Sequence, residues 1–406
     1  MASRLDTIQQ KTWLIDMFPE LDRSPIAVDS YISKNRFSNE IDQVFKHTWL
    51  CIGRIEELPV AGDFIVKNIP FDSISLIVIR DRANTIRAFY NVCTHRGNKL
   101  AWEQWGRSPA GFACKFHGWG FDPAGCLVNV PDREQFYDLN PDLHGLKQVA
   151  CDQWEGFIFV NLDPDPKETL SEYLGELGSG LTGYPFAEFK VCKQYVADVK
   201  CNWKVILDAF HEGYHVKYLH KRSVAAAFGN KDNPSMLFQK GDIALFPRHR
   251  YSSSGLGNPD YRPTPVEALA HRFGGVLNEL TAASELPSGV NRNKNPKWIM
   301  DLDVVFPNFQ MLVSKNWYLT YNFWPKAVDR TIYEVRLYYP LPQNAAQRFT
   351  QEFNLVKTRD SLLEDLSTVE ATQSVLASGA IKTLNISDQE ILIRHNHQVL
   401  NGYLNI

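Results

Sequence analysis

The sequence predicts an α+β chain in which a small all-β domain precedes a larger domain of antiparallel strands and helices. Between about Trp49 and Asp163, short runs rich in β-branched and aromatic residues are separated by Gly, Pro and Asn. After Asp163, strand-like runs alternate with long helical patterns. A length of 406 residues allows two or three domains, and we expect two.

The first element is a predicted helix within residues 26–47. Phe37, Ile41, Val44 and Phe45 follow one another at spacings of four, three and one, which is typical of a helix with one buried face. We expect this N-terminal segment, residues 1–45, to pack on the larger domain.

The all-β domain is expected over residues 46–165. Its clearest strand candidates are residues 63–66, 75–79 and 156–161. The segment Asp163-Pro-Asp-Pro-Lys167 cannot continue a strand, because it contains two prolines, and it is interpreted as a linker.

The larger domain is expected over residues 166–406. Strands are predicted at 195–199, 317–324 and 331–339, and helices near 203–220 and 343–378. The stretch from Phe228 to Pro296 is rich in Gly, Asn, Pro and Ser, so we expect long loops around a substrate entrance. A disordered insert is the alternative for this stretch.

Composition excludes several classes of protein. A net charge of -3 provides no basic surface for nucleic acid. Seven cysteines without a disulfide-framework spacing favour a reducing, cytoplasmic location. The first ten residues lack the apolar core of a signal peptide, and no stretch reaches the roughly 18 apolar residues of a membrane span. We therefore expect no membrane partner.

Two short motifs, Cys93-Thr94-His95 and Cys114-Lys115-Phe116-His117, contain four metal donors within 25 residues. Two thiolates and two imidazoles in this order suit a [2Fe-2S] cluster of the Rieske type, in which the cysteines hold one iron and the histidines the other. A Cys2His2 zinc site is the alternative, but its usual spacing pairs cysteine with cysteine and histidine with histidine. The order of the donors favours the cluster.

A second metal site is predicted in residues 202–220. On a continuous helix, Glu212, His215 and His220 would span an arc of roughly 140° and could face one cavity. Two imidazoles and a carboxylate are the ligands of mononuclear non-haem Fe(II) in oxygenases. Asp365 is the preferred third ligand, while Asp360 and Glu364 in the same predicted helix compete for this role.

These motifs together resemble the large catalytic subunit of the Rieske non-haem iron ring-hydroxylating oxygenases. Further matching features are Trp154-Glu-Gly-Phe-Ile-Phe-Val-Asn161, Asn202-Trp203-Lys204 and Gln373. The resemblance implies a Rieske domain followed by a helix-grip type catalytic domain. It also implies that Cys93, His95, Cys114 and His117 bind the cluster and that His215, His220 and Asp365 bind a mononuclear Fe(II).

The resemblance further implies a catalytic role for Glu212. Family members are cyclic trimers, some with a small beta subunit, and a carboxylate three residues before the first iron histidine connects it to the cluster histidine of a neighbouring subunit. This carboxylate is usually Asp, and here it is Glu212. Relatives acting on quaternary ammonium compounds resemble this chain in using Glu.

The implied function is that of a terminal oxygenase component using O2 and electrons from a ferredoxin or flavin reductase. Monooxygenation, dioxygenation and oxidative dealkylation remain open. The expected substrate is apolar and aromatic, because aromatic residues fall near segments that could line the site. They are Phe210, Phe246, Phe306, Phe309, Trp317, Phe323 and Trp324.

Two other functions remain open. A quaternary ammonium or methylamine substrate could use the same aromatic residues as a cation-π cage, and an acid such as Asp208 would then be needed. A non-catalytic Rieske electron carrier would explain the cluster motifs but not His215 and His220.

Overall fold

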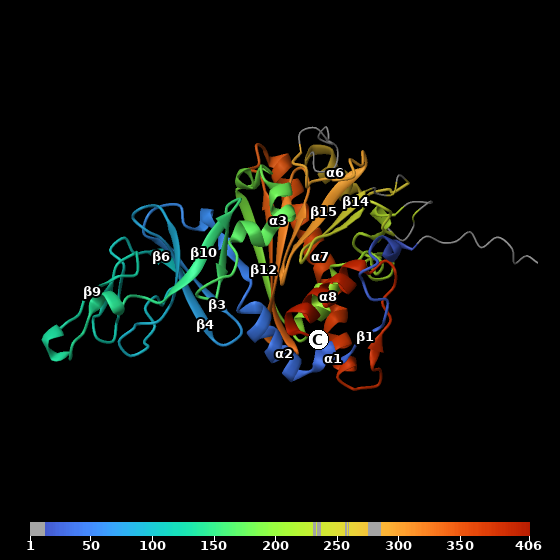
Figure 1. The fold of residues 1–406 in the computed structure, drawn as a ribbon. Helices are drawn as coiled ribbons and strands as arrows, with labels where there is room; N and C mark the ends of the chain where they lie inside the picture. The colour runs from blue at the N-terminus through green and yellow to red at the C-terminus, as the bar shows by residue number, and fades with distance from the viewer. Residues whose placement is uncertain (1–12, 230–232, 234–236, 256–257, 259, 275–285) are drawn as a thin grey trace, which may run out of the picture.

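The computed structural model describes residues 13–229, 233, 237–255, 258, 260–274 and 286–406. Figure 1 shows an elongated molecule with a β-rich end and a larger end where helices accompany a second sheet. The predicted α+β class is confirmed by two seven-stranded sheets and a long C-terminal helix. The first ten residues, used to argue against a signal peptide, lie outside the described part of the chain.

The N-terminal segment is helical as predicted but consists of three short pieces. They are α1 (Asp29–Ile32), α2 (Lys34–Glu40) and a π-helical turn (Ile41–Phe45). The chain breaks at Ser33 because its hydroxyl caps α2 by accepting the backbone N–H of Arg36 at 3.3 Å. Val44 and Phe45 are fully buried, and the Phe45 ring meets Trp203 of the larger domain edge-on at 5.2 Å.

The first sheet contains the predicted strands and has the order β2-β11-β10-β5-β4-β3-β6. Its strands are β2 (Trp49–Arg54), β3 (Asp63–Ile69), β4 (Ile74–Arg80), β5 (Ile86–Tyr90), β6 (Trp105–Arg107), β10 (Gln148–Trp154) and β11 (Phe157–Asn161). A small sheet of β7 (Phe112–Ala113), β8 (Gly120–Phe121) and β9 (Leu127–Asn129) extends from it. Both cysteine-histidine motifs lie in loops of this β-rich end.

The second sheet is antiparallel throughout, in the order β12-β18-β17-β16-β15-β14-β13. Its strands are β12 (Val191–Val199), β13 (Ile243–Leu245), β14 (Arg250–Gly255), β15 (Trp298–Val305), β16 (Phe309–Val313), β17 (Tyr318–Ala327) and β18 (Arg330–Tyr339). Short β1 (Ile26–Ala27) and β19 (Thr383–Leu384) pair elsewhere.

Helices accompany this sheet (Figure 1). They are α3 (Leu170–Leu181), α4 (Trp203–Ala209), α5 (Val216–Leu219), α6 (Pro265–Gly274), α7 (Ala345–Leu376) and α8 (Ile391–Leu404). Single 3-10 turns occur at Leu14–Met17, Ile55–Glu57, Arg133–Gln135, Pro141–Leu143, Phe186–Glu188 and Ala225–Ala227. Helix α7 matches the helix predicted at 343–378.

The single helix predicted near 203–220 is wrong. Helix α4 ends at Ala209, and a second short helix, α5, begins at Val216. Between them the Glu212 carboxylate accepts the backbone N–H of His215 at 3.0 Å. A side chain that bonds to the nearby backbone in this way competes with helix continuation. The helical arc predicted for Glu212, His215 and His220 therefore does not exist, although these residues still meet.

The prediction that residues 228–296 form long loops is wrong for part of this stretch, although its two end residues, Phe228 and Pro296, line the cavity described below. Strands β13 and β14 extend the sheet here, and α6 packs on α7. The weak periodicity arises because β14 is buried although it is polar: Arg250, Ser252 and Ser253 are all buried. Parts of this stretch, such as residues 275–285, lie outside the residues that the structure describes.

The two sheets are joined by a continuous core and by polar contacts. The hydrophobic cluster that contains Leu50 of β2 also contains Leu319 of β17. Lys67 of β3 binds Glu334 of β18 at 2.7 Å, and both side chains are mostly buried. These contacts hold the β-rich end against β17 and β18 of the larger sheet.

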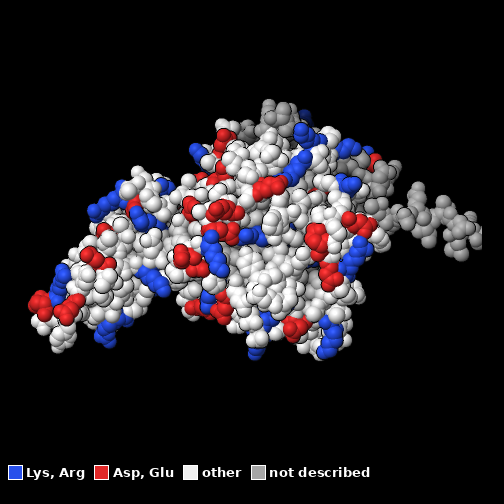
Figure 2. All heavy atoms as spheres, viewed as in Figure 1, with Lys and Arg blue, Asp and Glu red and all other residues white. Residues whose placement is uncertain are grey.

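The surface agrees with the weak net charge. Figure 2 shows acidic and basic side chains interspersed over the visible face. In the described part of the chain, no helix has the length and apolar character needed to cross a bilayer.

Candidate metal centres and substrate cavity

The first candidate centre is built by the two loops with the cysteine-histidine motifs. The rings of His95 and His117 lie 4.6 Å apart, and Trp119 stacks on His95 at 4.8 Å with an interplanar angle of 10°. Within the described chain, the Nδ1 atoms of both histidines are buried and have no hydrogen-bond partner. Since buried polar atoms are normally paired, both nitrogens are available for a ligand. Cys93 and Cys114 are buried beside them.

The backbone of these loops favours close approach to a metal cluster. Each motif ends in a glycine with a left-handed conformation, Gly97 at φ 76° and Gly118 at φ 74°, which only glycine adopts without strain. The N–H of each glycine bonds back to the carbonyl of the cysteine four residues earlier, Cys93 or Cys114, at 2.9 Å. The two turns are therefore alike, as expected for two loops holding one inorganic core.

The two thiols differ in their readiness to ionise. Burial raises the pKa of Cys93. Burial also opposes ionisation of Cys114, but backbone N–H groups of its own loop and the Asn98 amide outweigh it and lower the pKa. The Asn98 Nδ2 lies 3.6 Å from the Cys114 Sγ. Hydrogen bonds to a sulfur of this kind also suit a bound cluster, whose potential depends on them.

The second candidate centre brings together His215, His220 and Asp365. The Nε2 atoms of the two histidines are 3.2 Å apart. The Asp365 Oδ1 lies 3.1 Å from the Nε2 of His220 and 3.7 Å from the Nε2 of His215. One ligand atom from each residue falls within 4.8 Å of the others. Two imidazoles and one carboxylate in this arrangement fit a mononuclear iron with open positions.

Two further carboxylates orient the imidazoles. Glu212 Oε1 lies 2.5 Å from the Nδ1 of His215, and Glu364 Oε2 lies 2.8 Å from the Nδ1 of His220. An Nδ1–H donated to a carboxylate leaves Nε2 free for a metal, as is usual for metal-binding histidines. Asp360, the other predicted competitor, is exposed and pairs with its neighbour in the sequence.

Charge around His220 is consistent with a cation site. Burial disfavours the charged imidazole, but hydrogen bonds and charges from Asp365 and Glu364 outweigh it and raise the pKa of His220. The same two carboxylates would attract a metal cation. The orienting role of Glu364 was missed, because its sequence position only made it a competing ligand.

His211 is not a member of this centre. It is fully buried, and neither ring nitrogen has a partner within the described residues. Burial, with the nearby charge of Arg250, lowers its pKa well below the ordinary value. His211 is therefore a neutral side chain in the wall of the cavity described next.

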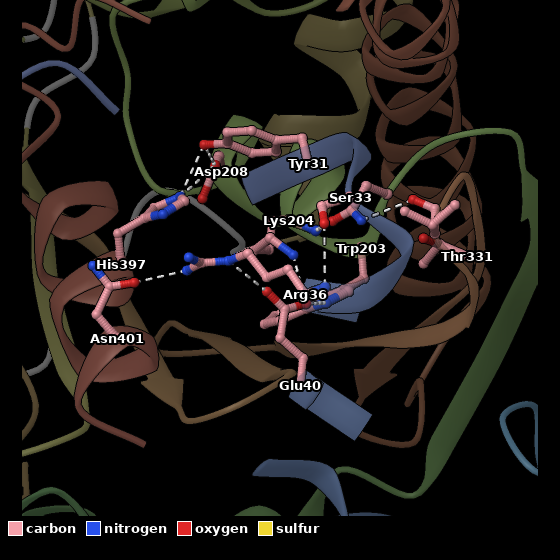
Figure 3. A network of polar contacts seen from close by, with 12 residues as sticks. Tyr31, Ser33, Arg36, Glu40, Trp203, Lys204, Asp208, Thr331, His397 and Asn401 are labelled. Atoms are coloured by element: carbon pink, nitrogen blue, oxygen red, sulfur yellow. Dashed lines mark hydrogen bonds and ion pairs between the residues drawn. The ribbon is translucent and has the colours of Figure 1, made fainter. Parts of the chain in front are cut away.

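The iron-site residues border a cavity of about 760 Å³. Of the seven aromatic residues predicted to contact substrate, only Phe210 and Trp317 line it. The other five belong to the hydrophobic core clusters. They are Phe246, Phe306, Phe309, Phe323 and Trp324. Asp208, proposed to balance a cationic substrate, does not line it either and instead accepts a hydrogen bond from Tyr31 at 2.7 Å (Figure 3).

Comparison with known protein families matches both halves of the chain. The family described as "Ring hydroxylating alpha subunit (catalytic domain)" matches residues 186–405, and the Rieske [2Fe-2S] domain family matches residues 48–150. The chain belongs to the ring-hydroxylating alpha subunit family. The two predicted cofactors, a [2Fe-2S] cluster and a mononuclear iron, are those of this pair of domains.

Curated relatives of this alpha subunit include both monooxygenases and dioxygenases. The carnitine monooxygenase oxygenase subunit of Escherichia coli K12 is 30% identical over 191 residues, which are 47% of this chain and 50% of that one. The naphthalene 1,2-dioxygenase large oxygenase component of Pseudomonas putida is 33% identical over 197 residues, 46% of this chain and 42% of that one. The chain thus spans about half the length of the curated relatives it matches.

Solved structures share the fold of this alpha subunit along nearly its whole length. A quaternary ammonium Rieske monooxygenase in complex with an inhibitor has a TM-score of 0.72 at 18% identity, covering 95% of this chain and 96% of that one. Naphthalene 1,2-dioxygenase with bound indole has a TM-score of 0.67 at 21% identity, covering 94% and 92%.

Proposed function

We propose that this chain is the terminal oxygenase component of a multicomponent Rieske oxygenase. It would receive electrons from a ferredoxin or flavin reductase and use O2 to hydroxylate a small apolar, aromatic molecule. The observation that supports this most is the convergence of His215, His220 and Asp365 at the wall of a 760 Å³ cavity, in a chain with a Rieske domain.

We assign the metal-binding roles as follows. Cys93, Cys114, His95 and His117 hold the cluster, and His215, His220 and Asp365 hold the iron. When bound, Fe(II) supplies the O2 chemistry that side chains lack. Glu212 and Glu364 retain a proton on each Nδ1 and so keep both Nε2 atoms directed at the metal.

The cavity supplies position and a water-poor environment. Five leucines among the described residues contribute to its wall. They are Leu302, Leu312, Leu319, Leu337 and Leu362. An apolar wall holds an apolar substrate by burial alone, so orientation depends on the few polar groups that the cavity contains.

Glu212 is assigned a second role in electron transfer between subunits. Exposed apolar side chains flank both centres: Phe116 beside His117, and Tyr214 and Tyr218 beside His215. Exposed apolar residues of this kind mark surfaces that bind other chains. We propose a homotrimer, with or without a small subunit, in which Glu212 connects the His215 of one subunit to the cluster of the next.

A second candidate function is monooxygenation of a quaternary ammonium compound. It is favoured by the Glu at position 212 and by relatives named carnitine monooxygenase and glycine betaine monooxygenase oxygenase subunits. The location we propose is the cytoplasm, since all seven cysteines are free.

The test is the metal content of the purified protein and of His215→Ala. The wild type should contain about three irons and two acid-labile sulfides per chain, and the variant about two irons with the Rieske EPR signal intact. A wild type prepared with excess iron that holds only two irons would contradict the oxygenase and leave an electron carrier. Oxygen uptake with a chemical reductant would then be the same in both proteins.

A further inference from the structure

The cavity has a second, polar end that the iron site does not use. About three turns of α7 face the cavity, with lining residues at 354, 357, 358, 361, 362 and 365. This spacing of three and four is one face of a helix. Asp365 marks the iron end, and Lys357 lies eight residues earlier, which is about 12 Å along the helix axis.

At this end an ion pair forms part of the cavity wall. Lys357 of α7 contacts the carboxylate of Glu267 on α6, and the Tyr261 hydroxyl donates to the same carboxylate. All three residues line the cavity. The Glu267 side chain is only 4% exposed and that of Lys357 is 22% exposed.

A buried ion pair in the wall of a cavity needs a reason. Removing two charges from water is costly, and such pairs are often no more stabilising than well-packed apolar residues. Tying α6 to α7 would therefore not by itself favour charges here. The Glu267 carboxylate is already engaged by two donors, whereas an ammonium group has three N–H donors and its contact with Glu267 uses one. The Lys357 ammonium therefore has N–H donors left with which it can bind a hydrogen-bond acceptor.

We infer that the substrate carries an oxygen acceptor, a carboxylate or a carbonyl, at the end of the molecule remote from the carbon that is oxidised. Lys357 donates to this oxygen, while Glu267 and Tyr261 hold the ammonium in place. The apolar body between these ends is a ring system that fills the leucine-lined middle of the cavity. The position of the oxidised carbon rests on the proposed function, but recognition of the oxygen by Lys357 does not.

This recognition disfavours a quaternary ammonium group at the same place. A trimethylammonium has no N–H to donate and would meet the Lys357 charge directly. Among the described residues, three acids line the wall: Glu212 and Asp365, which belong to the iron site, and Glu267, which is paired.

The test is binding of four probes that share one skeleton. They are biphenyl-4-carboxylate, 4-acetylbiphenyl, 4-isopropylbiphenyl and the trimethylammonium analogue of biphenyl. Dissociation constants are measured by calorimetry on the metal-loaded protein without reductant. We expect at least one of the two oxygen-bearing probes to bind ~10-fold more tightly than the isopropyl probe, as for a hydrogen bond to a charged group. The carboxylate and acetyl arms distinguish the two kinds of acceptor.

Variants connect this preference to Lys357. Lys357→Met should abolish the ~10-fold difference, and Lys357→Arg should retain it. Lys326→Met, which removes a lysine paired with Asp198 outside the cavity, is the matched control and should not change it. If Lys357→Met does not fold, the double variant Glu267→Gln with Lys357→Gln removes both charges together.

Equal binding of the isopropyl and both oxygen-bearing probes, or a preference that survives Lys357→Met, would overturn the inference. Tightest binding of the trimethylammonium probe would do the same. These outcomes can be told apart from a failure of the proposed function. The expected binding preference without product, on reduction in the presence of O2, contradicts the oxygenase alone. Product from all probes without a binding preference contradicts only the Lys357 site.

Discussion

Glu212 makes two contacts with one histidine: one carboxylate oxygen accepts the backbone N–H of His215, and the other lies at its Nδ1. A residue bonded in this way positions the imidazole, and by our proposal it also connects it to the neighbouring cluster. Glu364 positions the imidazole of His220 in the same way, but we assign it no connection to a neighbouring cluster. The two acids can therefore be separated by experiment.

Glu212→Gln should lower the rate of cluster reoxidation per bound iron by ~10-fold or more, because an amide has one acceptor oxygen instead of two and its NH2 group would face an N–H donor. The measurement is stopped-flow reoxidation of the reduced cluster in the presence of O2 and substrate. Glu364→Gln is the control: it should loosen an imidazole of the iron site in the same way, but the reoxidation rate per bound iron should stay near that of wild type. An unchanged reoxidation rate in Glu212→Gln would contradict the connecting role.

The buried side chain of His395 makes the stability of the fold depend on pH. Burial, with the charge of Arg250, lowers the pKa of His395 from 6.5 to about 3. Between these values the unfolded chain binds the proton and the folded chain does not, so stability falls as pH falls from about 6.5 towards 3.

His395→Phe removes the contribution of this histidine to the pH dependence of stability. Its stability relative to wild type should improve as pH falls through that window, with a slope approaching ~1.4 kcal/mol per pH unit. Urea unfolding at several pH values measures the difference in free energy of unfolding between the variant and the wild type. The contributions of other titrating groups, such as Asp301, are the same in both proteins and cancel. A difference that is constant between pH 7 and 4 would show that His395 takes up its proton at the same pH in the folded and the unfolded chain.

At the scale of elements, a buried ion pair fixes the N-terminal segment to the catalytic domain. Figure 3 shows Glu40 of α2 between Arg36 and the pair Trp203 and Lys204 of α4. The Glu40 Oε2 accepts from the Lys204 ammonium at 2.6 Å and from the Trp203 indole at 2.9 Å. Both charged side chains are fully buried. The helix that carries Trp203 also leads to the iron site, so this contact positions α4.

Glu40→Gln should lower the free energy of unfolding by about 3 kcal/mol, because it leaves the Lys204 charge buried without its partner. Adding Lys204→Met should recover part of this loss, since no charge then remains unpaired. Thermal or chemical unfolding of the two variants and wild type gives the comparison. A double variant less stable than Glu40→Gln would mean that Lys204 stabilises the fold without its partner.

At the scale of the whole molecule, the cluster loops and the iron site lie in different parts of an elongated chain (Figure 1). Apolar side chains are exposed near each of them, including Phe116 and Tyr218. A closed ring of identical subunits would bring the cluster end of one chain to the iron site of the next and cover both patches.

Mixed oligomers test this arrangement. Cys93→Ala lacks the cluster and His215→Ala lacks the mononuclear iron, so each should be inactive alone. Co-expressed at equal levels, they should form trimers with about a quarter of wild-type activity, since half the subunits hold iron and half of those have a cluster-bearing neighbour. Mixed trimers of verified composition without activity would show that electrons do not cross between subunits.

Much of the fold was predictable from local patterns. Strands such as 63–69 and 330–339 and the long helix 345–376 follow from periodicity, because one buried face imposes a spacing of two or of three to four residues. The helix across 203–220 was wrong, since periodicity does not reveal that Glu212 bonds to the backbone of His215. Strand β14 was missed because its buried residues are polar.

By itself, the sequence determined the metal-donor motifs that are close in the chain: Cys93 with His95, Cys114 with His117, and His215 with His220. Short separation limits the geometry of such pairs, so residue types and spacing are informative. Only the tertiary structure decided which distant groups join them. Asp365 rather than Asp360 reaches the histidines, Glu364 orients His220, and Lys357 meets Glu267 across the cavity. These contacts depend on how α7 packs against α4, α6 and the sheet, and packing between distant elements leaves no local pattern in a single sequence.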